Sequence, residues 1–216
     1  MSSVPKVPDS IAEYRSTPSR TGPLNRAFDI LCALVGLVSL SPLFCVIAIA
    51  IKCDDGGPVF FAHNRIGKDF RRFRVWKFRS MVPGADRGAL LTSPADSRVT
   101  RIGRRLRRYK LDELPQLFNI LSGDMQLVGA RPEVEPYVQM FRPQYEVLLQ
   151  DRPGITDPAT LAHRREEQMF SGSRIERQYV DEILPAKLQL SLDYQQRRTF
   201  PSDLGILIRT VFGLIQ

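Results

Sequence analysis

The chain has 216 residues and a formal net charge of +8, and 43% of its residues are hydrophobic. A chain of this length can bury one good core, so we expect one main domain with appendages. The charge is concentrated in residues 64–110, which contain 15 Lys or Arg and three Asp. Such a block suits nucleic acid, anionic lipid head groups or a polyphosphate ligand. The three cysteines have no framework spacing, which argues against a disulfide-rich secreted domain.

Residues 1–22 are rich in Ser, Pro and charged residues without periodicity, and we expect a flexible tail there. The longest apolar stretch follows at residues 27–51, with Asp29 as its only charge. This stretch is long enough to cross a bilayer, and a buried core helix of this length is unusual in so small a domain. Pro42 lies near its middle, where it removes a backbone hydrogen bond and forces a bend.

Basic residues flank this segment on both sides, at Lys6, Arg15, Arg20, Arg26, Lys52, Arg65 and Lys68. Because cytoplasmic flanks are the positive ones, both ends should lie on the same side of the membrane. A kinked, re-entrant helix over residues 23–52, with a Ser-Pro break, satisfies both observations. Asp29 would then lie near the head groups, where a charge is less costly than at the midplane. A straight transmembrane helix and a core helix are the alternatives.

Two short segments, 59–62 and 73–78, predict a β-hairpin whose turn contains Gly67-Lys68-Asp69. Beyond it, residues 81–100 contain the Gly and Pro residues of a loop. Two adjacent carboxylates, Asp112 and Glu113, then follow directly after a run of cations. Apolar residues recur every three or four positions from Leu111 to Leu121, which predicts a helix with one buried face.

We expect this helix to start at or just before Asp112, because Asp is a favoured N-cap and Pro115 is tolerated only in a first turn. The helix dipole and nearby Arg side chains should then keep the Asp112 carboxylate ionised. An ionised carboxylate among cations can act as a nucleophile or as a metal ligand in phosphate chemistry. The alternative is a solvated helix cap without a chemical role.

The remaining elements are mainly helical: about 133–141, a second helix ending near 151, and 176–200 with an interruption at Pro185. After Ser202-Asp203 a last apolar helix could lie at a membrane interface or pack in the core. The predicted fold class is therefore α+β, mostly α. It is a small catalytic domain with a minor β-hairpin on a kinked re-entrant membrane helix, with interfacial amphipathic helices.

Several segments, in this order, resemble the bacterial sugar transferase family, the monotopic polyprenyl-phosphate phosphoglycosyl transferases. The matching segments are Ser41-Pro42, Lys77 to Met81, Arg98 to Gly103, Leu111 to Asn119, Gly123 to Met125, Val128 to Pro132 and Arg152 to Thr156. The resemblance covers roughly residues 24–216, and it is specific because the segments occur together and in order. It implies a cytoplasmic phosphoglycosyl transferase domain over residues 53–216, held at the inner membrane.

The resemblance implies transfer of a sugar 1-phosphate from a nucleotide diphosphate sugar, usually a UDP-sugar, to polyprenyl phosphate such as undecaprenyl phosphate. The products would be polyprenyl diphosphate sugar and UMP, in the first membrane step of glycoconjugate or exopolysaccharide assembly. Asp112 would be the nucleophile that forms a covalent phosphosugar intermediate, with Glu113 as its partner. Mg²⁺ would be the required ion, held by both carboxylates, and Arg107 would bind phosphate.

Lys77, Arg79 and Arg131 are further candidates for phosphate contacts, with a solvated surface cation as the alternative for each. Asp124 could cap a turn or join the metal ligands, and we favour the turn. Two other functions compete: a non-catalytic, membrane-anchored basic module that binds anionic lipid or nucleic acid, and an enzyme that releases nucleoside diphosphate. The ordered motifs favour phosphosugar transfer, with membrane lipid and no nucleic acid as a partner. The exposed apolar helices are compatible with a homodimer.

Overall fold

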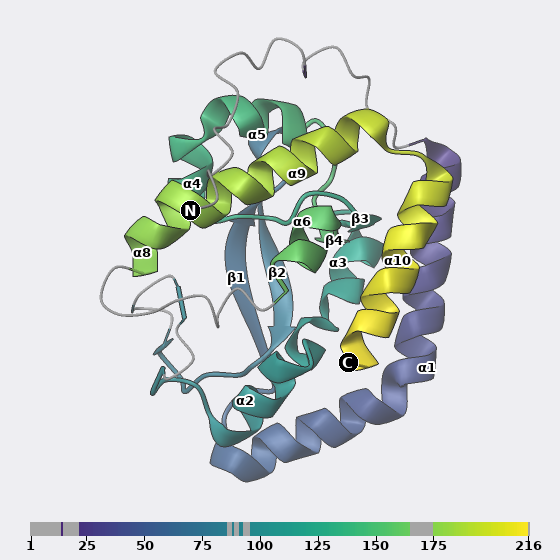
Figure 1. Ribbon diagram of the computed structural model, residues 1–216. Helices are drawn as coiled ribbons and strands as arrows, with labels where there is room; N and C mark the ends of the chain where they lie inside the picture. The colour runs from purple at the N-terminus through teal and green to yellow at the C-terminus, as the bar shows by residue number, and fades with distance from the viewer. Residues whose placement is uncertain are drawn as a thin grey trace.

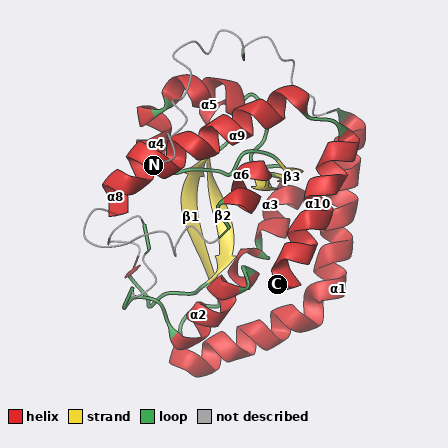
Figure 2. Ribbon diagram, viewed as in Figure 1, coloured by secondary structure: helices red, strands yellow, loops and turns green. Residues whose placement is uncertain are grey.

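A computed structural model describes residues 14, 22–85, 88, 91–92, 96–164 and 175–215. In this part of the chain helices dominate, and the strands form two separate pairs (Figure 2). The predicted fold class, α+β and mostly α, is confirmed. The predicted tail lies outside the described residues except at Tyr14 and Gly22. Tyr14 is buried, and its hydroxyl donates to Asp193 Oδ1 at 3.0 Å, so the chain is held against the domain at that residue.

The helices are α1 (Pro23–Asp55), α2 (Arg101–Arg108), α3 (Gln116–Ser122), α4 (Glu135–Met140), α5 (Arg142–Leu148), α6 (Pro158–Ala162), α8 (Ile175–Gln178), α9 (Leu184–Arg197) and α10 (Phe200–Ile215). The strands are β1 (Phe60–Ile66), β2 (Arg72–Phe78), β3 (Gln126–Val128) and β4 (Gly154–Thr156). A π-helical turn, Tyr179–Ile183, joins α8 to α9. The α-helical pattern is thus interrupted directly before α9, which has Pro185 in its first turn, where no N–H is available for the preceding turn.

Helix α1 has the length and composition of a membrane helix. It is 33 residues long and, among the described residues, the one helix long and apolar enough to cross a bilayer. Only 11% of its most apolar window is buried inside the domain, so the core does not account for its composition. An exposed apolar surface of this size marks a membrane or protein contact, and the length of the helix favours the membrane.

The long helix bends near its middle, as predicted. Figure 1 shows its first half running beside α10 and its second half turning to run beneath α2. Pro42 has no N–H to donate to the carbonyl of Val38, one turn earlier. The Ser41 hydroxyl donates to that carbonyl instead, at 2.8 Å. The helix therefore continues through the Ser-Pro step with a bend, and the backbone polar group released by proline keeps a partner.

Two charged residues attach α1 to the connection between α3 and β3. The Arg26 guanidinium donates to the carbonyls of Leu121 and Met125 at 3.3 and 3.4 Å. One turn later, Asp29 Oδ1 accepts from the backbone N–H of Leu127 at 3.3 Å. Asp29 is buried against the domain, and its depth relative to the head groups stays a prediction. Its charge is tolerated in an apolar helix because it faces the domain and a backbone donor.

Replacing Asp29 by Leu should lower the free energy of unfolding by roughly 1–3 kcal/mol, because the Leu127 N–H would be buried without an acceptor. Asn at the same position keeps an acceptor oxygen of the same reach and should retain most of the stability. Urea unfolding of both variants in detergent measures the difference. A Leu variant as stable as the wild-type protein would show that this contact does not hold α1 to the domain.

The β-hairpin predicted from the sequence is present and longer than expected. Strands β1 and β2 pair antiparallel, with Phe60 opposite Phe78 and Ile66 opposite Arg72. A second sheet, which the sequence did not reveal, pairs β3 with β4 in parallel. Each of these strands has only three residues, too few for an alternating pattern to be visible.

The last helix has one face in the core and one exposed apolar face. Ile206 of α10 is buried and packs with Ala33 of α1 and Met125, so one face belongs to the core. Five large apolar side chains of α10 are exposed: Phe200, Leu204, Ile208, Val211 and Phe212. The first half of α1 lies alongside α10 (Figure 1), so the two exposed apolar surfaces are neighbours.

Candidate active site

The two adjacent carboxylates lie in a tight turn between α2 and α3. Leu111–Glu113 form a 3₁₀ turn, preceded by Lys110 in the left-handed backbone region, with a φ of 55°. Helix α3 begins only after Pro115. The helix was predicted to start at or just before Asp112; a 3₁₀ turn does start at Leu111, but the α-helix itself begins at Gln116. Asp112 and Glu113 are presented from a turn and not from a helix cap.

Glu113 is held by two cations from different elements. Its Oε1 accepts from Lys77 Nζ, on β2, at 2.8 Å. Arg131, shortly after β3, donates to both oxygens of Glu113, with Nη1 3.0 Å from Oε2. Burial favours the protonated acid, but Arg131 and Lys77 outweigh it and hold the pKa of Glu113 well below its usual value. The same burial lowers the pKa of Lys77. Glu113 is thus an ionised carboxylate whose charge is balanced by Lys77 and Arg131.

Asp112 is in a different electrostatic situation, although it is the neighbouring residue. Its side chain is buried with 6% exposure, and its Oδ1 has no hydrogen-bond donor. Burial is the largest influence and raises the pKa of Asp112, with Lys77 opposing it and Glu113 adding to it. The nearby cations Lys77, Lys110 and Arg107 lower the pKa of Asp112, as expected, but they do not outweigh its burial. The site therefore pairs one cation-bound carboxylate with one unsatisfied carboxylate.

Asn119 of α3 fixes the carboxylate turn against the strand that carries Lys77. Its Oδ1 accepts from the backbone N–H of Trp76 at 2.9 Å, and its Nδ2 donates to the carbonyl of Arg74 at 2.7 Å. The side-chain amide thus pairs with the open edge of β2 as a neighbouring strand would. Asn119 is 1% exposed, and the sequence analysis gave it no role. A polar residue on the apolar face of α3 is the signal that could have identified it.

Replacing Asn119 by Ala should destabilise the fold by roughly 2–4 kcal/mol, because two buried backbone groups of β2 would lose their partners. Asp at this position keeps the acceptor but places a second oxygen against the Arg74 carbonyl, so Asp should not restore stability. Thermal unfolding of both variants in detergent tests this. If Asp restores wild-type stability, the Nδ2 contact contributes nothing.

Two of the predicted phosphate-binding arginines lie in different surroundings. Arg107, in the last turn of α2, is close enough to contribute to lowering the pKa of Asp112. Arg79 is buried and directed to the end of α1, where its Nη1 donates to Asp55 Oδ2 and its Nε donates to the Pro58 carbonyl, both at 2.6 Å. The structure therefore brings Lys77, Arg131 and Arg107 toward the two carboxylates. It places Arg79 in a separate ion pair.

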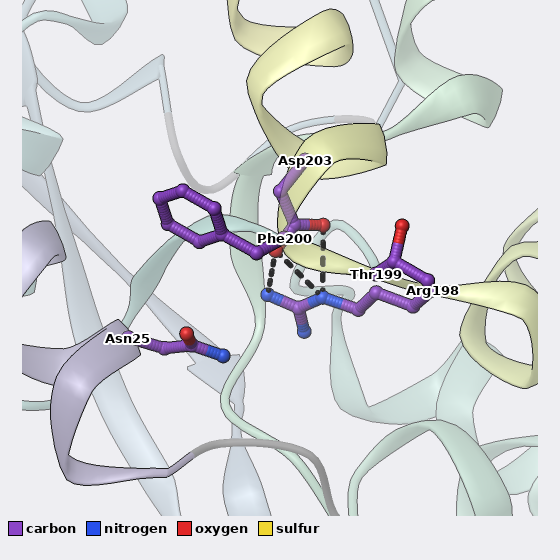
Figure 3. Close-up of a pocket in the computed structure, with 5 residues that line it drawn as sticks. All are labelled: Asn25, Arg198, Thr199, Phe200 and Asp203. Atoms are coloured by element: carbon purple, nitrogen blue, oxygen red, sulfur yellow. Dashed lines mark hydrogen bonds and ion pairs between the residues drawn. The ribbon is translucent and has the colours of Figure 1, made fainter.

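A cavity of about 380 Å³ lies away from the carboxylate turn, where α1 meets the corner between α9 and α10. Figure 3 shows Asn25 and Arg198 reaching toward each other across it. The Arg198 guanidinium is already paired with Asp203 through hydrogen bonds of 2.9 to 3.0 Å. Because this pair is neutral as a whole, the cavity offers less attraction to a phosphate than the cations around Asp112.

A profile of the bacterial sugar transferase family matches residues 20–216. The chain belongs to the bacterial sugar transferase family. The matched region includes every element of the carboxylate site, from α1 and β2 to Arg131. This confirms the resemblance seen in the sequence.

Several curated relatives of this sugar transferase chain have named activities. It is 43% identical, over 65% of its length, to UDP-N-acetylgalactosamine-undecaprenyl-phosphate N-acetylgalactosaminephosphotransferase of Aeromonas hydrophila, of which it covers 34%. It is 36% identical, over 88% of its length, to UDP-glucose:undecaprenyl-phosphate glucose-1-phosphate transferase of Escherichia coli, of which it covers 39%. It is also 35% identical, over 86% of its length, to exopolysaccharide production protein ExoY of Sinorhizobium fredii, of which it covers 83%. The chain thus spans little more than a third of two relatives and most of the other.

The carboxylate turn of this sugar transferase offers one strong acceptor for a metal ion. Among the described residues, no three His, Cys, Asp or Glu side chains converge into a metal-binding group. Mg²⁺ is commonly held by one or two carboxylates together with substrate phosphates, so two adjacent carboxylates are compatible with it. Asp112 Oδ1 is a buried acceptor without a donor, whereas both Glu113 oxygens already accept from cations. Asp124 accepts from Ser122 Oγ at 2.6 Å in the turn after α3, which agrees with the turn role favoured for it over metal binding.

Proposed function

We propose that this chain transfers a sugar 1-phosphate from a nucleotide diphosphate sugar, with UDP as the expected nucleotide, to polyprenyl phosphate, and that Asp112 is the nucleophile. The observation that carries the proposal is the asymmetry of the two carboxylates. Asp112 has an oxygen without a donor, while Glu113 is bound by Lys77 and Arg131. A nucleophile needs an available lone pair, and of these two carboxylates Asp112 is the one with an oxygen that accepts no hydrogen bond.

In the first step an Asp112 oxygen attacks the phosphorus that bears the sugar. The bond between this phosphorus and the bridging oxygen breaks, and the nucleoside monophosphate leaves with the bond's electron pair. In the second step a phosphate oxygen of the polyprenyl phosphate attacks the same phosphorus. The aspartyl–phosphorus bond breaks, which restores the carboxylate and gives polyprenyl diphosphate sugar. Two displacements at one nucleophile mean that the two bulky anions need not be bound together.

The surrounding cations address the main barrier to this chemistry, which is repulsion between an anionic nucleophile and an anionic diphosphate. Lys77, Arg131 and Arg107 approach the carboxylates from β2, the β3 side and α2. Positive groups arranged before the reaction stabilise charge on the leaving phosphate without further reorganisation. Mg²⁺ bound by Asp112, with Glu113 beside it, would neutralise part of the diphosphate charge. Chelation of divalent metal should therefore stop turnover.

We place the reaction at the cytoplasmic face of the inner membrane, with α1 entering and leaving through one leaflet. The bend at Pro42 and the basic residues on both flanks support this placement. Cysteines introduced at Gly22 and Lys52, in a chain without its native cysteines, should both react with an impermeant thiol reagent from the cytoplasmic side only. Labelling from opposite sides would show a transmembrane helix.

The transfer itself is tested by nucleotide release from detergent-purified protein supplied with Mg²⁺, undecaprenyl phosphate and a panel of UDP-sugars. UMP that appears together with polyprenyl diphosphate sugar supports the proposal, and the active donor identifies the sugar. Release of UDP would indicate transfer of the sugar alone. A folded protein that binds anionic lipid but releases no nucleotide from any donor would favour the non-catalytic module.

A further inference from the structure

One face of α2 consists of exposed arginines at helical spacing. Arg101, Arg104, Arg105 and Arg108 are exposed and recur every three or four residues, so they share one face. The opposite face, with Ile102 and Leu106, packs against apolar residues of the second half of α1. None of the described residues forms an ion pair with Arg101, Arg104 or Arg105. Adjacent cations without acidic partners repel one another, so this face is suited to an anion from outside the chain.

The arginine face begins where α1 ends. The Ile102 N–H donates to Asp54 Oδ2 at 3.2 Å, which joins the first turn of α2 to the last turn of α1. Along the helix axis Asp54 is about 18 Å from Pro42, at about 1.5 Å per residue. The hydrocarbon layer of one leaflet is about 15 Å thick. If the bend of α1 lies inside one leaflet, an inclined second half brings Asp54 and α2 to the head-group layer.

We propose that the arginine face of α2 binds anionic phospholipid head groups at the point where α1 leaves the bilayer. The inference rests on the re-entrant placement given under the proposed function. Guanidinium groups match phosphate oxygens in pairs, and cations at an anionic membrane surface add attraction that salt weakens. Arg107, on the same helix but turned toward Asp112, would then be held at the depth of the lipid phosphates. An acceptor phosphate would reach the site at this depth.

The same arginines could instead bind the phosphates of a substrate. Their location favours phospholipid. The cations that act on the carboxylates are Lys77, Arg131, Lys110 and Arg107, whereas the exposed face of α2 belongs to other positions. The lipid proposal therefore predicts a dependence on membrane composition that is present without any substrate.

The test measures how the full-length protein partitions from detergent into vesicles of phosphatidylcholine, with and without phosphatidylglycerol. The wild-type protein should prefer the anionic vesicles by about tenfold at low salt, and the preference should shrink at high salt. A variant with Arg101→Gln, Arg104→Gln and Arg105→Gln should lose this preference. A matched variant with Arg71→Gln, Arg74→Gln and Arg177→Gln loses the same charge from exposed positions on the hairpin and α8, and should keep it. Equal preference in both variants would overturn the proposal.

A second measurement separates phospholipid from substrate. In nanodiscs of phosphatidylcholine alone, the α2 variant should have the KM of the wild-type protein for both polyprenyl phosphate and nucleotide sugar. A raised KM in these neutral membranes would assign the arginines to a substrate and overturn the lipid proposal. Because partitioning is measured without substrates, an inactive protein that still prefers anionic vesicles would contradict only the proposed transferase activity.

Discussion

Replacing Asp112 by Asn should abolish transfer while leaving the protein folded and at least as stable as the wild type. The loss of a covalent nucleophile lowers turnover on the order of 10⁴-fold or more. Stability should rise by about 1 kcal/mol, because Asn removes a buried charge that has no hydrogen-bond donor on Oδ1. Nucleotide release and urea unfolding, measured on the same preparation, give both quantities. The two effects have opposite signs, which is typical of a residue retained for chemistry and not for structure.

The covalent intermediate provides a direct control for this prediction. With donor and no acceptor, the wild-type protein should accumulate a phosphosugar adduct that intact-mass measurement detects, and the Asn variant should not. Substantial activity in the Asn variant would remove Asp112 as nucleophile. An inactive but unfolded variant would instead give Asp112 a structural role, which its unsatisfied oxygen does not suggest.

The sequence predicted the site's members better than their arrangement. Asp112 and Glu113 are adjacent and follow a run of cations, so the cluster of charge was visible. The spacing of leucines predicted a helix starting near Asp112, but α3 begins only at Gln116, and the burial that raises the pKa of Asp112 is not visible in any local pattern. The partners of Glu113 are Lys77 on β2 and Arg131 after β3. No local pattern shows that these segments meet.

Long-range contacts explain the other differences. Asp29 was visible as the only charge of an apolar stretch, but its partner, the N–H of Leu127, lies 98 residues away in the chain and was not predicted. Strands β3 and β4 are stabilised only by pairing with each other, which a window of three residues cannot reveal. The α1 bend was predictable, in contrast, because Pro42 acts on its own preceding turn. The bend was predicted from a neighbour in sequence, whereas the partner of Asp29 and the pairing of β3 with β4 depend on neighbours in space and were not.

These contacts connect the membrane helix to the chemistry. Arg26 and Asp29 hold the α3–β3 connection, α3 follows the carboxylate turn, and β3 leads to Arg131. Asn119 joins the same helix to the strand of Lys77. The cations and carboxylates are therefore placed by elements that rest directly on α1. A site built in this way can be held at a fixed depth relative to the membrane, as the proposed lipid-linked acceptor requires.

The neighbours of Asp112 should shift the pH dependence of turnover in opposite directions. Asp112 acts as the carboxylate, so the rate should fall as the pH drops through its pKa, which burial has raised. Lys77 lowers that pKa, so Lys77→Met should move the acid limb to higher pH. Glu113 raises it, so Glu113→Gln should move the acid limb to lower pH. The pH profile of kcat/KM measures both shifts, and displacement of both variants in the same direction would show that Asp112 does not set the acid limb.

Stability separates these two variants as well. Glu113→Gln leaves Lys77 and Arg131 close together without their shared carboxylate, and should destabilise the fold by roughly 2–4 kcal/mol. Lys77→Met leaves Glu113 paired with Arg131, so its loss should be smaller. The Glu113 contribution should also depend on pH. Its pKa is lowered in the folded state, so the stabilisation is present above the pKa of an unfolded Glu and is lost as the pH falls through the folded value. Unfolding of Glu113→Gln should accordingly approach that of the wild type in acid from lower stability. Asp112→Asn should approach it from higher stability, because the buried Asp112 charge is lost by protonation as the pH falls through its raised pKa.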